Sequence, residues 1–273
     1  MIQINASIVL YHNNREQLKK VINSFFETNL NVQLYLVDNS QTDELKDIVA
    51  YDQRIKYIFN NENIGYGAGH NIAIRKSIEQ NIKYHLVLNP DLYFKGEIID
   101  KLFSYMNKND DVGNIMPKIL YPNGDNQFLA KLLPTPLDWI LRRFLPAKYT
   151  QEITNKFELR YTGYGHIMNV PFLSGCFMFL RTGALKNVGL FDENIFMYME
   201  DVDLNRRIHN TYKTLYYPDV EIYHEYERGS HKNFKLLRIS IESSVKYFNK
   251  WGWIFDSERK KINNTLLNET NYE

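Results

Sequence analysis

Residues 4–14 have the sequence INASIVLYHNN, which begins the most regular part of the chain. The run from Ile4 to Tyr11 is apolar and rich in β-branched side chains, as is typical of a buried strand inside a sheet. Residues 14–28 then place apolar side chains on one face of a helix. A nicotinamide-dinucleotide enzyme carries a G-x-G-x-x-G fingerprint at such a strand-to-helix turn, and Tyr11-His12-Asn13 contains no glycine. The stretch therefore predicts a strand and a helix and disfavours a dinucleotide-binding enzyme.

The alternation of strands and helices continues as far as Asp91. The expected segments are a strand at Val32–Val37, a short helix at 43–50, a strand at Lys56–Phe59, a glycine-rich loop at 63–71 leading into a helix that ends near Gln80, and a strand at His85–Leu88. This β-α-β-α-β-α-β order predicts an α/β fold with a mostly parallel central sheet flanked by helices.

The regular alternation of strands and helices is interrupted at residues 126–165, where an apolar and basic segment is flanked by prolines. We expect an insertion with its own short helix there. The later expected elements are a strand at Val170–Leu180, a helix at Glu200–His209, strands at Thr214–Tyr217 and Val220–His224, and a final helix at about Asn233–Phe248. We therefore divide the chain into a domain of residues 1–227, with halves 1–120 and 170–227 around an insertion at 121–169, and a C-terminal helical extension at 228–273.

The composition excludes several classes of protein. Hydrophobic residues make up 44% and charged residues 24%, which is ordinary for a globular chain and wrong for a disordered one. The net charge of +1 supplies no general attraction to nucleic acid. The single cysteine, Cys176, excludes an internal disulfide and a thiolate zinc site. With no signal-peptide pattern and no run of about 18 apolar residues, a cytoplasmic protein is expected.

Polar residues follow several of the expected strands. In a parallel sheet the ligand lies at the carboxyl ends of the strands, so Tyr11–Asn13, Asp38–Ser40 and Asn89–Asp91 are expected to share one crevice. Asp38 could accept a hydrogen bond from the imide N–H of uracil or thymine, while its neighbours could simply cap a helix. Both interpretations remain open. The glycine-rich loop either borders a ligand or forms a tight structural turn.

Two residues are candidates for holding a metal ion. Pro90 stops a strand and directs Asp91 over the crevice, where a carboxylate could bind a hard cation that carries a diphosphate. Asn-Pro-Asp is also ordinary turn chemistry. His224 ends another apolar strand, where metal ligation, diphosphate binding and a structural role are all open.

The segment FMYMEDVDLNRR, residues 196–207, is the strongest local feature. Its acids begin a helix, where the helix dipole favours them and Arg207 could pair with one of them a turn away. Asp201, however, lies between apolar Met199 and Val202, which is unusual for a surface helix. A partly buried carboxylate beside a crevice is what a general base requires.

Taken in order, these segments resemble the family 2 glycosyltransferases of the GT-A fold, and in particular their rhamnosyltransferase branch. The resemblance covers about residues 4–250. It rests on LVDNSQTD at 36–43, NIGYGAGHN at 63–71, LNPD at 88–91, Ser174-Gly175, GLFDE at 189–193 and EDVD at 200–203. One position departs from the family pattern, because Asn89 stands where the D-x-D metal motif has its first acid.

The resemblance implies an inverting transfer with Asp201 as the catalytic base and Glu200 beside it. It implies that Asp91 and His224 hold Mg²⁺ or Mn²⁺. The donor-binding residues that it implies, together with the strand-end residues, are Tyr11, Asn13, Asp38, Asn39, Gly65, Gly69, Asn71, Asn89, Ser174, Gly175 and Arg207. The implied donor is a nucleotide sugar, with dTDP-rhamnose first and UDP-sugars (galactofuranosyl, glucosyl) as the alternative, and the acceptor is a glycan or a lipid-linked glycan in surface polysaccharide synthesis.

The residues leave two alternative functions. A non-catalytic nucleotide-sugar or glycan-binding module is supported by Asn89 and disfavoured by the intact Glu200-Asp201 pair. A nucleotidyltransferase would carry a glycine-rich, basic loop after the first strand, which is absent. The basic, Trp-flanked final helix either packs on the domain or makes peripheral contact with the anionic inner leaflet.

Overall fold

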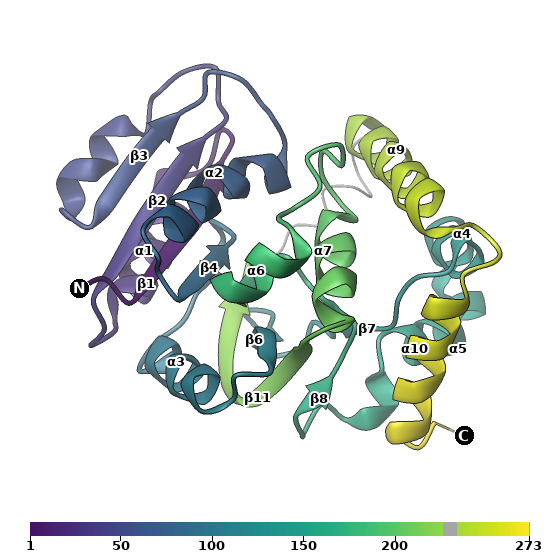
Figure 1. Cartoon of the computed structure of the whole chain (residues 1–273). Helices are drawn as coiled ribbons and strands as arrows, with labels where there is room; N and C mark the ends of the chain where they lie inside the picture. Colours follow the sequence, from purple (N-terminus) through teal and green to yellow (C-terminus); the bar gives the residue numbers. More distant parts are fainter. Residues whose placement is uncertain (226–233, 273) are drawn as a thin grey trace.

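The computed structural model describes residues 1–225 and 234–272 (Figure 1). The expected domain boundary between residues 227 and 228, and the expected start of the final helix at Asn233, lie outside the described residues. Within the described part, the main sheet has the strand order β3-β2-β1-β4-β10-β6-β11-β5, with β8 added on β11. Helices cover both faces of this sheet (Figure 1), so the predicted α/β architecture is confirmed.

The N-terminal half follows the predicted order. Its elements are β1 (Ile4–Leu10), α1 (Arg15–Phe26), β2 (Val32–Asp38), the 3-10 helix η1 (Lys46–Tyr51), β3 (Ile55–Phe59), α2 (Tyr66–Glu79) and β4 (Tyr84–Leu88). Strands β1 to β4 are all parallel to one another. The side chains of β1, β2 and β4 are almost entirely buried, whereas only Ile55 is buried in the edge strand β3. Asn14 caps α1 by accepting hydrogen bonds from the backbone N–H groups of Glu16 and Gln17.

The glycine-rich segment was wrongly predicted to be a loop throughout. Helix α2 begins at Tyr66, so Gly67 and Gly69 lie inside its first turns. A Cβ atom on Gly69 would lie 2.7 Å from a methyl group of Val9, and one on Gly67 would lie 2.8 Å from Cβ of Phe191. These glycines therefore bring α2 close to β1 and to the segment after α6.

The second half contains the elements β5 (Leu92–Tyr93), α3 (Ile98–Lys108), β6 (Val112–Leu120), β10 (Phe177–Arg181), α6 (Thr182–Val188), α7 (Glu200–His209) and β11 (Lys213–His224). Strand β10 is antiparallel to β4 and β6, and β5 is antiparallel to β11, so the sheet is mixed beyond β4. The two strands expected at 214–224 form one strand, β11, whose register shifts between Tyr217 and Glu221. Helices α3 and α6 and strand β6 were not predicted from the sequence.

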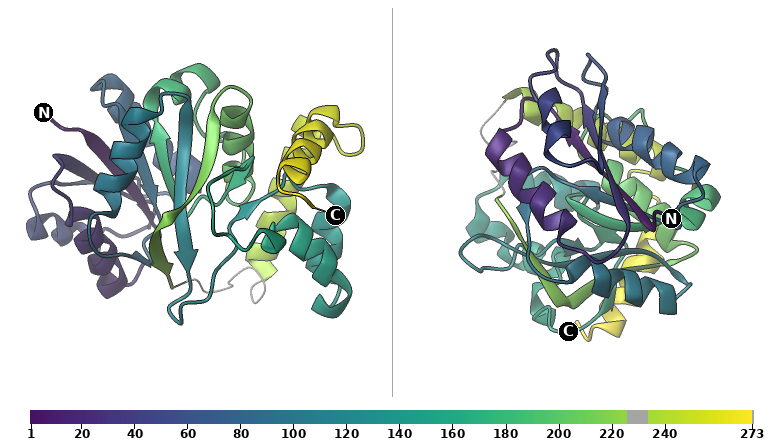
Figure 2. Two further views of the ribbon diagram at one scale, coloured as in Figure 1. Left: turned by 90° about the horizontal axis from the view of Figure 1, so that it is seen from below. Right: turned by 90° about the vertical axis from the view of Figure 1, so that its left-hand side faces the viewer.

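The insertion contains two helices rather than one. Its elements are β7 (Ala130–Lys131), α4 (Pro136–Phe144), α5 (Ala147–Phe157), the 3-10 helix η2 (Arg160–Thr162) and β8 (Met168–Asn169). Strand β7 pairs with the short β9 (Phe172–Leu173), which tethers the insertion to the main domain. Its teal helices lie with the yellow C-terminal helix at one end of the molecule in Figure 1 and in the left view of Figure 2.

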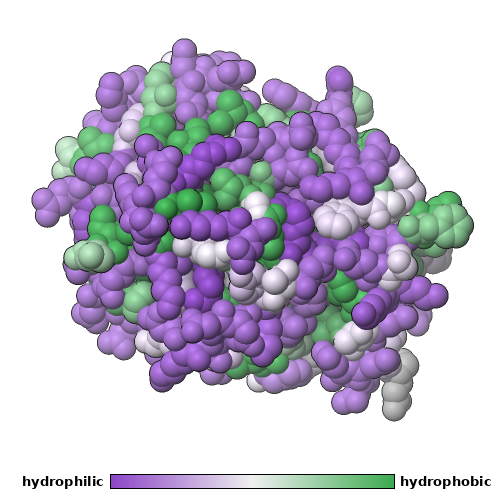
Figure 3. All heavy atoms as spheres, viewed as in Figure 1, coloured by the Kyte–Doolittle hydropathy of each residue, from purple (hydrophilic) through white to green (hydrophobic). Residues whose placement is uncertain are grey.

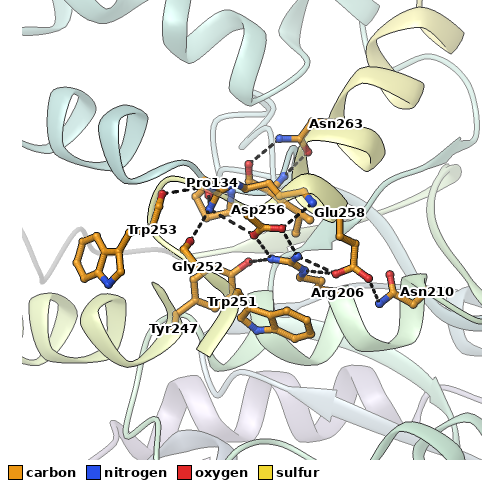
Figure 4. Close-up of polar contacts among 12 residues, drawn as sticks. Pro134, Arg206, Asn210, Tyr247, Trp251, Gly252, Trp253, Asp256, Glu258 and Asn263 are labelled. Carbon is orange, nitrogen blue, oxygen red and sulfur yellow. Dashed lines mark hydrogen bonds and ion pairs between the residues drawn. The ribbon is translucent and has the colours of Figure 1, made fainter. Parts of the chain in front are cut away.

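The C-terminal segment forms α9 (Phe234–Trp251) and a further helix, α10 (Ser257–Glu269), which was not predicted. Arg206 of α7 holds this segment, because its side chain is only 1% exposed and donates to both carboxylate oxygens of Asp256 at 2.7 Å (Figure 4). The same guanidinium donates to Glu258 at 2.7 and 3.0 Å and lies over the ring of Trp251 at 4.0 Å. Trp251 in turn donates to Asp203 of α7 at 2.8 Å.

The turn between α9 and α10 exposes apolar side chains. Ile254 is 80% exposed and Phe255 is 94% exposed. Figure 3 shows a mostly hydrophilic face with an apolar projection at its right-hand edge, in the region that Figure 1 gives to α4 and this turn. Among the described helices, none combines the length and the hydropathy that a membrane crossing requires.

We predict that Arg206→Met destabilises the fold strongly, because the buried carboxylate of Asp256 loses both short hydrogen bonds from the guanidinium and is left with the longer ion pair with Arg259, at 3.5 Å. Removing one side of a buried ion pair costs about 3–5 kcal/mol. The matched control is Arg238→Met, whose ion pair with Glu242 is exposed on α9 and should contribute less than about 1 kcal/mol. Urea unfolding measures both, and equal small effects would show that Arg206 does not anchor the segment.

Candidate active site

Tyr66 links two segments, at Asn89 and Gly175, that the family resemblance had assigned to the donor site. Its hydroxyl group lies 2.9 Å from Oδ1 of Asn89, which follows β4, and 2.8 Å from the carbonyl oxygen of Gly175. The N–H of Gly175 donates to Oδ2 of Asp201 at 2.8 Å. The structure therefore connects Asn89, Gly175 and Asp201 through one tyrosine that was not predicted to belong to the site.

Gly175 has a steric role at this point. A Cβ atom there would lie 3.0 Å from Cβ of Asp201 and 3.3 Å from its Oδ2. The single strand expected at Val170–Leu180 is wrong, since it divides into β9 and β10 around Ser174-Gly175-Cys176. This break turns the backbone N–H of Gly175 toward the carboxylate.

The segment before α7 holds Glu200 and Asp201 in an unusual backbone conformation. Tyr198 and Met199 both have positive φ angles, 67° and 71°, which few residues other than glycine adopt. Such strain persists only where surrounding contacts impose it, and it is common at functional sites. The hydroxyl of Ser243 on α9 donates to the carbonyl of Met197 at 2.8 Å, so the C-terminal segment supports this turn.

The two neighbouring carboxyl groups have different surroundings. Burial, and then the charge of Asp201, raise the pKa of Glu200 well above its ordinary value. Its Oε2 atom is buried and accepts no hydrogen bond from the described residues. Burial also raises the pKa of Asp201, but the backbone N–H groups of Gly175 and Val202 and the charge of Lys131 oppose it. The arrangement favours a neutral Glu200 beside an ionised Asp201, which can accept a proton.

Asp91 and His224 also converge. Nε2 of His224 lies 3.2 Å from Oδ1 of Asp91, and Nδ1 lies 3.0 Å from Oε1 of Gln127. Gln127 also donates to the carbonyl of His224, which fixes the imidazole from the insertion. Burial lowers the pKa of His224, but Cys176 and Asp91 outweigh it and raise this pKa to about 10.

This pair fits a metal ion that arrives with a ligand. The described residues contain no group of three or more His, Cys, Asp or Glu side chains that could enclose a cation by themselves. One carboxylate and one imidazole leave most coordination positions for phosphate oxygens and water, as is usual for Mg²⁺ at phosphate sites. Without a metal, the raised pKa favours an imidazolium that could itself bind a diphosphate.

The residues expected to bind the base lie at the ends of β1 and β2. Asp38 is buried and accepts from the backbone N–H of Ser40 at 2.8 Å and from the hydroxyl of Tyr57 at 2.5 Å. A carboxylate has about four acceptor positions, so capacity for one more donor remains. Tyr11 is exposed, and its backbone N–H donates to Asn13 at 2.7 Å.

Four predicted donor-binding residues are engaged by the protein itself. Asn39 joins Gly65 and Asn60, and Asn71 bonds to Phe191 and Glu193. A Cβ on Gly65 would lie 2.4 Å from the carbonyl oxygen of Phe196. Gly69 packs on Val9, as described above.

Arg207 is also engaged internally. Its side chain donates to Asp203 and to the carbonyl groups of residues 188–190. These contacts position α7 and the segment before it. We therefore leave Arg207 out of the donor site proposed below.

Three residues escaped the sequence analysis: Tyr66, Gln127 and Lys131. Each acts through a partner distant in the sequence, so no local spacing indicates its role. The one available signal was the position of Tyr66 between two glycines of the motif at 63–71.

Comparison with protein-family models matches residues 7–189 to the model described as glycosyl transferase family 2. A low-salt glycan biosynthesis hexosyltransferase of Haloferax volcanii is 28% identical over 206 residues, which are 74% of this chain and 61% of that protein. An N-acetylglucosaminyl-diphospho-decaprenol L-rhamnosyltransferase of Mycobacterium tuberculosis is 28% identical over 71% of this chain and 66% of its own length. The chain thus spans less than two thirds of both relatives. The rhamnosyltransferase WbbL of Escherichia coli is 23% identical over 88% of this chain and 90% of its own.

Solved structures share the fold at low sequence identity. GalNAc-T7 with UDP, GalNAc and Mn²⁺ superposes with a TM-score of 0.61 at 15% identity, covering 83% of this chain and 43% of that one. Residues 1–349 of S. aureus TarS give a TM-score of 0.60 at 16% identity, covering 98% of this chain and 71% of that one. These neighbours confirm the GT-A-type fold.

Proposed function

The chain belongs to glycosyl transferase family 2, and we propose that it is an inverting enzyme that moves a sugar from a nucleoside-diphosphate donor to a hydroxyl group of a glycan or lipid-linked glycan. The observation that carries the proposal is the position of Asp201. The N–H of Gly175 donates to its carboxylate. The hydroxyl group of Tyr66 contacts both the carbonyl oxygen of Gly175 and the side-chain oxygen of Asn89. Two residues, Gly175 and Tyr66, thus link a potential base to the strand end where a diphosphate is expected.

The chemistry proposed for this site is a single displacement. The acceptor oxygen attacks the anomeric carbon while the bond from that carbon to the nucleoside diphosphate breaks on the opposite face. Asp201 takes the proton of the attacking hydroxyl group. The neutral Glu200 is able to donate a hydrogen bond to a sugar hydroxyl and so to orient one substrate.

The leaving group requires positive charge as it departs. Mg²⁺ or Mn²⁺, when bound, would neutralise the diphosphate, and Asp91 and His224 are the residues that would hold it. Asn89 is engaged by Tyr66 through its side-chain oxygen, so it stands in the structure as a link to Gly175 rather than as a second acidic ligand.

The donor proposed first is dTDP-rhamnose. Two relatives, from M. tuberculosis and E. coli, are named as rhamnosyltransferases. The carboxylate of Asp38, which accepts from Ser40 and Tyr57, keeps acceptor capacity for the imide N–H of thymine. UDP-sugars, such as galactofuranosyl or glucosyl donors, are the alternative, because two structural neighbours were solved with UDP.

The proposed acceptor also suggests where in the cell the protein acts. One relative is named for a lipid-linked substrate, so we propose that the protein works on the cytoplasmic face of a membrane in surface polysaccharide synthesis. The basic groups of α9 expected at the leaflet are partly engaged, since Lys246 donates to the carbonyl of Asn194 and Lys250 pairs with Asp192 and Asp203. The exposed Ile254 and Phe255 remain available for such contact.

We predict that Asp201→Asn retains donor binding and loses transfer by about two to four orders of magnitude, because it removes the general base. The assay measures release of the nucleoside diphosphate and glycosylated product, after screening dTDP-, UDP- and GDP-sugars with the wild type. The control is the exposed Asp219→Asn, which should be silent. Near-normal transfer by Asp201→Asn would exclude Asp201 as the base.

The same assay should show an acidic limb set by Asp201. Only the ionised carboxylate accepts a proton, so kcat/KM should fall as the pH drops through its pKa. Because burial raises this pKa, the fall should occur above pH 3.8, the ordinary value for aspartate. A wild-type profile that stays flat down to pH 4 would contradict the assignment.

We predict that Asp91→Ala abolishes the Mn²⁺-dependent part of nucleoside-diphosphate binding. Calorimetry with dTDP or UDP should show that EDTA weakens binding to the wild type and changes nothing further in the variant. Asp125→Ala, at an exposed turn, is the matched control. If Asp91→Ala binds as the wild type does with Mn²⁺, Asp91 holds no metal.

A further inference from the structure

The insertion presents three cationic side chains, each lying over an aromatic ring. The guanidinium of Arg142 lies 3.7 Å from the ring centre of Phe157, and that of Arg160 lies 4.6 Å from Phe128. The ammonium group of Lys131 lies 5.6 Å from the ring centre of Phe172. Rings hold such cations in place without neutralising their charge.

One carboxylate lies among these cations. Arg160 donates twice to Oε2 of Glu158, at 2.8 and 2.5 Å, and Arg142 lies 3.8 Å from Oε1. We call Lys131, Arg142, Glu158 and Arg160 the insertion cluster. It has two positive charges in excess, and Nε of Arg142 is buried without a hydrogen-bond partner among the described residues.

Lys131 is the member that lies on β7, the strand paired with the segment leading to Gly175 and Asp201. Within the described part of the chain, no carboxylate oxygen lies within 4.0 Å of its ammonium group. Burial lowers the pKa of Lys131, and the charge of Arg142 acts in the same direction, while the charges of Glu158 and Asp201 oppose them. A partly desolvated ammonium group without an ion pair is well suited to receive an anionic ligand.

Backbone pairing fixes the position of Lys131 relative to the base. Lys131 pairs with Phe172 across β7 and β9, and the N–H of Ser174 donates to the carbonyl of Leu129. The next residue, Gly175, holds Asp201. Backbone pairing therefore connects Lys131 to the segment that holds Asp201.

The insertion helices lie on the side of α7 away from strands β1 to β4 (Figure 1). In Figure 1, α7 stands between the β1–β4 half, which carries Asp38, and the helices α4 and α5 of the insertion. A donor whose base lies near Asp38 and whose diphosphate lies near Asp91 approaches Asp201 from the first side. The insertion would then face an acceptor substrate that approaches Asp201 from the opposite side.

We propose that Lys131, together with Arg142 and Arg160, binds a diphosphate group carried by the acceptor substrate. The proposal rests on the transferase function proposed above and deepens it, since it assigns the acceptor to the class of diphosphate-linked glycans. Planar guanidinium groups suit the oxygens of such a group, and the ammonium supplies a third charge beside the sugar that Asp201 deprotonates.

The test is calorimetric binding of geranyl diphosphate, with geraniol as the neutral probe and EDTA present to suppress metal-dependent binding at Asp91. The wild type should bind the diphosphate more tightly than geraniol. Lys131→Met should weaken diphosphate binding about 10- to 100-fold, which is the usual effect of losing a charged hydrogen bond. Lys131→Arg should retain most of it, and melting curves verify that both variants are folded.

The matched control is Lys148→Met. Lys148 also belongs to the insertion and lies over a ring, that of Tyr149, but it is exposed at the opposite end of α5. Ten helical residues separate it from Glu158, a rise of about 15 Å. Its substitution should leave binding unchanged. No binding by the wild type, or equal binding by the wild type and Lys131→Met, would overturn the proposal.

A second arm distinguishes the acceptor diphosphate from that of the donor. Binding of dTDP and UDP with Mn²⁺ should be the same in the wild type and Lys131→Met, and a comparable loss there would assign the cluster to the donor and overturn the proposal. These binding tests require no turnover. Absence of transfer from every nucleotide sugar would therefore defeat the proposed function, while geranyl diphosphate binding reports separately on the insertion cluster.

Discussion

The buried guanidinium of Arg206 fixes the helix on which the candidate site depends. It joins α7 to Asp256 and Glu258, while Asp203 on the same helix receives hydrogen bonds or ion pairs from Arg207, Lys250 and Trp251. These contacts hold α7 so that its first turn meets the break between β9 and β10. The C-terminal segment is therefore part of the support for Glu200 and Asp201, and the strained turn at residues 198–199 is held in place by the same packing.

Much of the fold could be predicted because its signals are local. The apolar runs and helical faces of residues 4–88 are complete within each segment, and the helix at Glu200–His209 begins where its acids indicate. The antiparallel insertion of β10 between β4 and β6 could not be predicted, since strand order depends on pairing between distant segments. Gly67 and Gly69 were predicted to lie in a loop but lie in a helix. Glycine is required both in a tight turn and in a helix that packs closely on its neighbours, so the residue type alone does not distinguish the two.

The candidate site shows the same division. Asp91, His224 and Asp201 each carry a local signal, as a polar residue at a strand end or helix start. Tyr66, Gln127 and Lys131 carry none, because each matters through one contact with a residue at least 20 positions away. Arg207 shows the reverse case, since its i,i+4 spacing from Asp203 already indicated the ion pair that the structure contains. Local sequence patterns therefore identify the candidate reactive groups more easily than they identify the residues that position those groups.

The central claim is that one crevice brings a nucleoside diphosphate from Asp38 to Asp91, with Asp201 on its acceptor side. A crystal structure of the protein with dTDP and Mn²⁺ tests it most directly. The account predicts the thymine beside Asp38, the diphosphate and metal at Asp91 and His224, and the carboxylate of Asp201 facing the open side of the bound nucleotide. A nucleotide bound elsewhere, or a diphosphate that leaves Asp91 and Asp201 on unconnected surfaces, would contradict it.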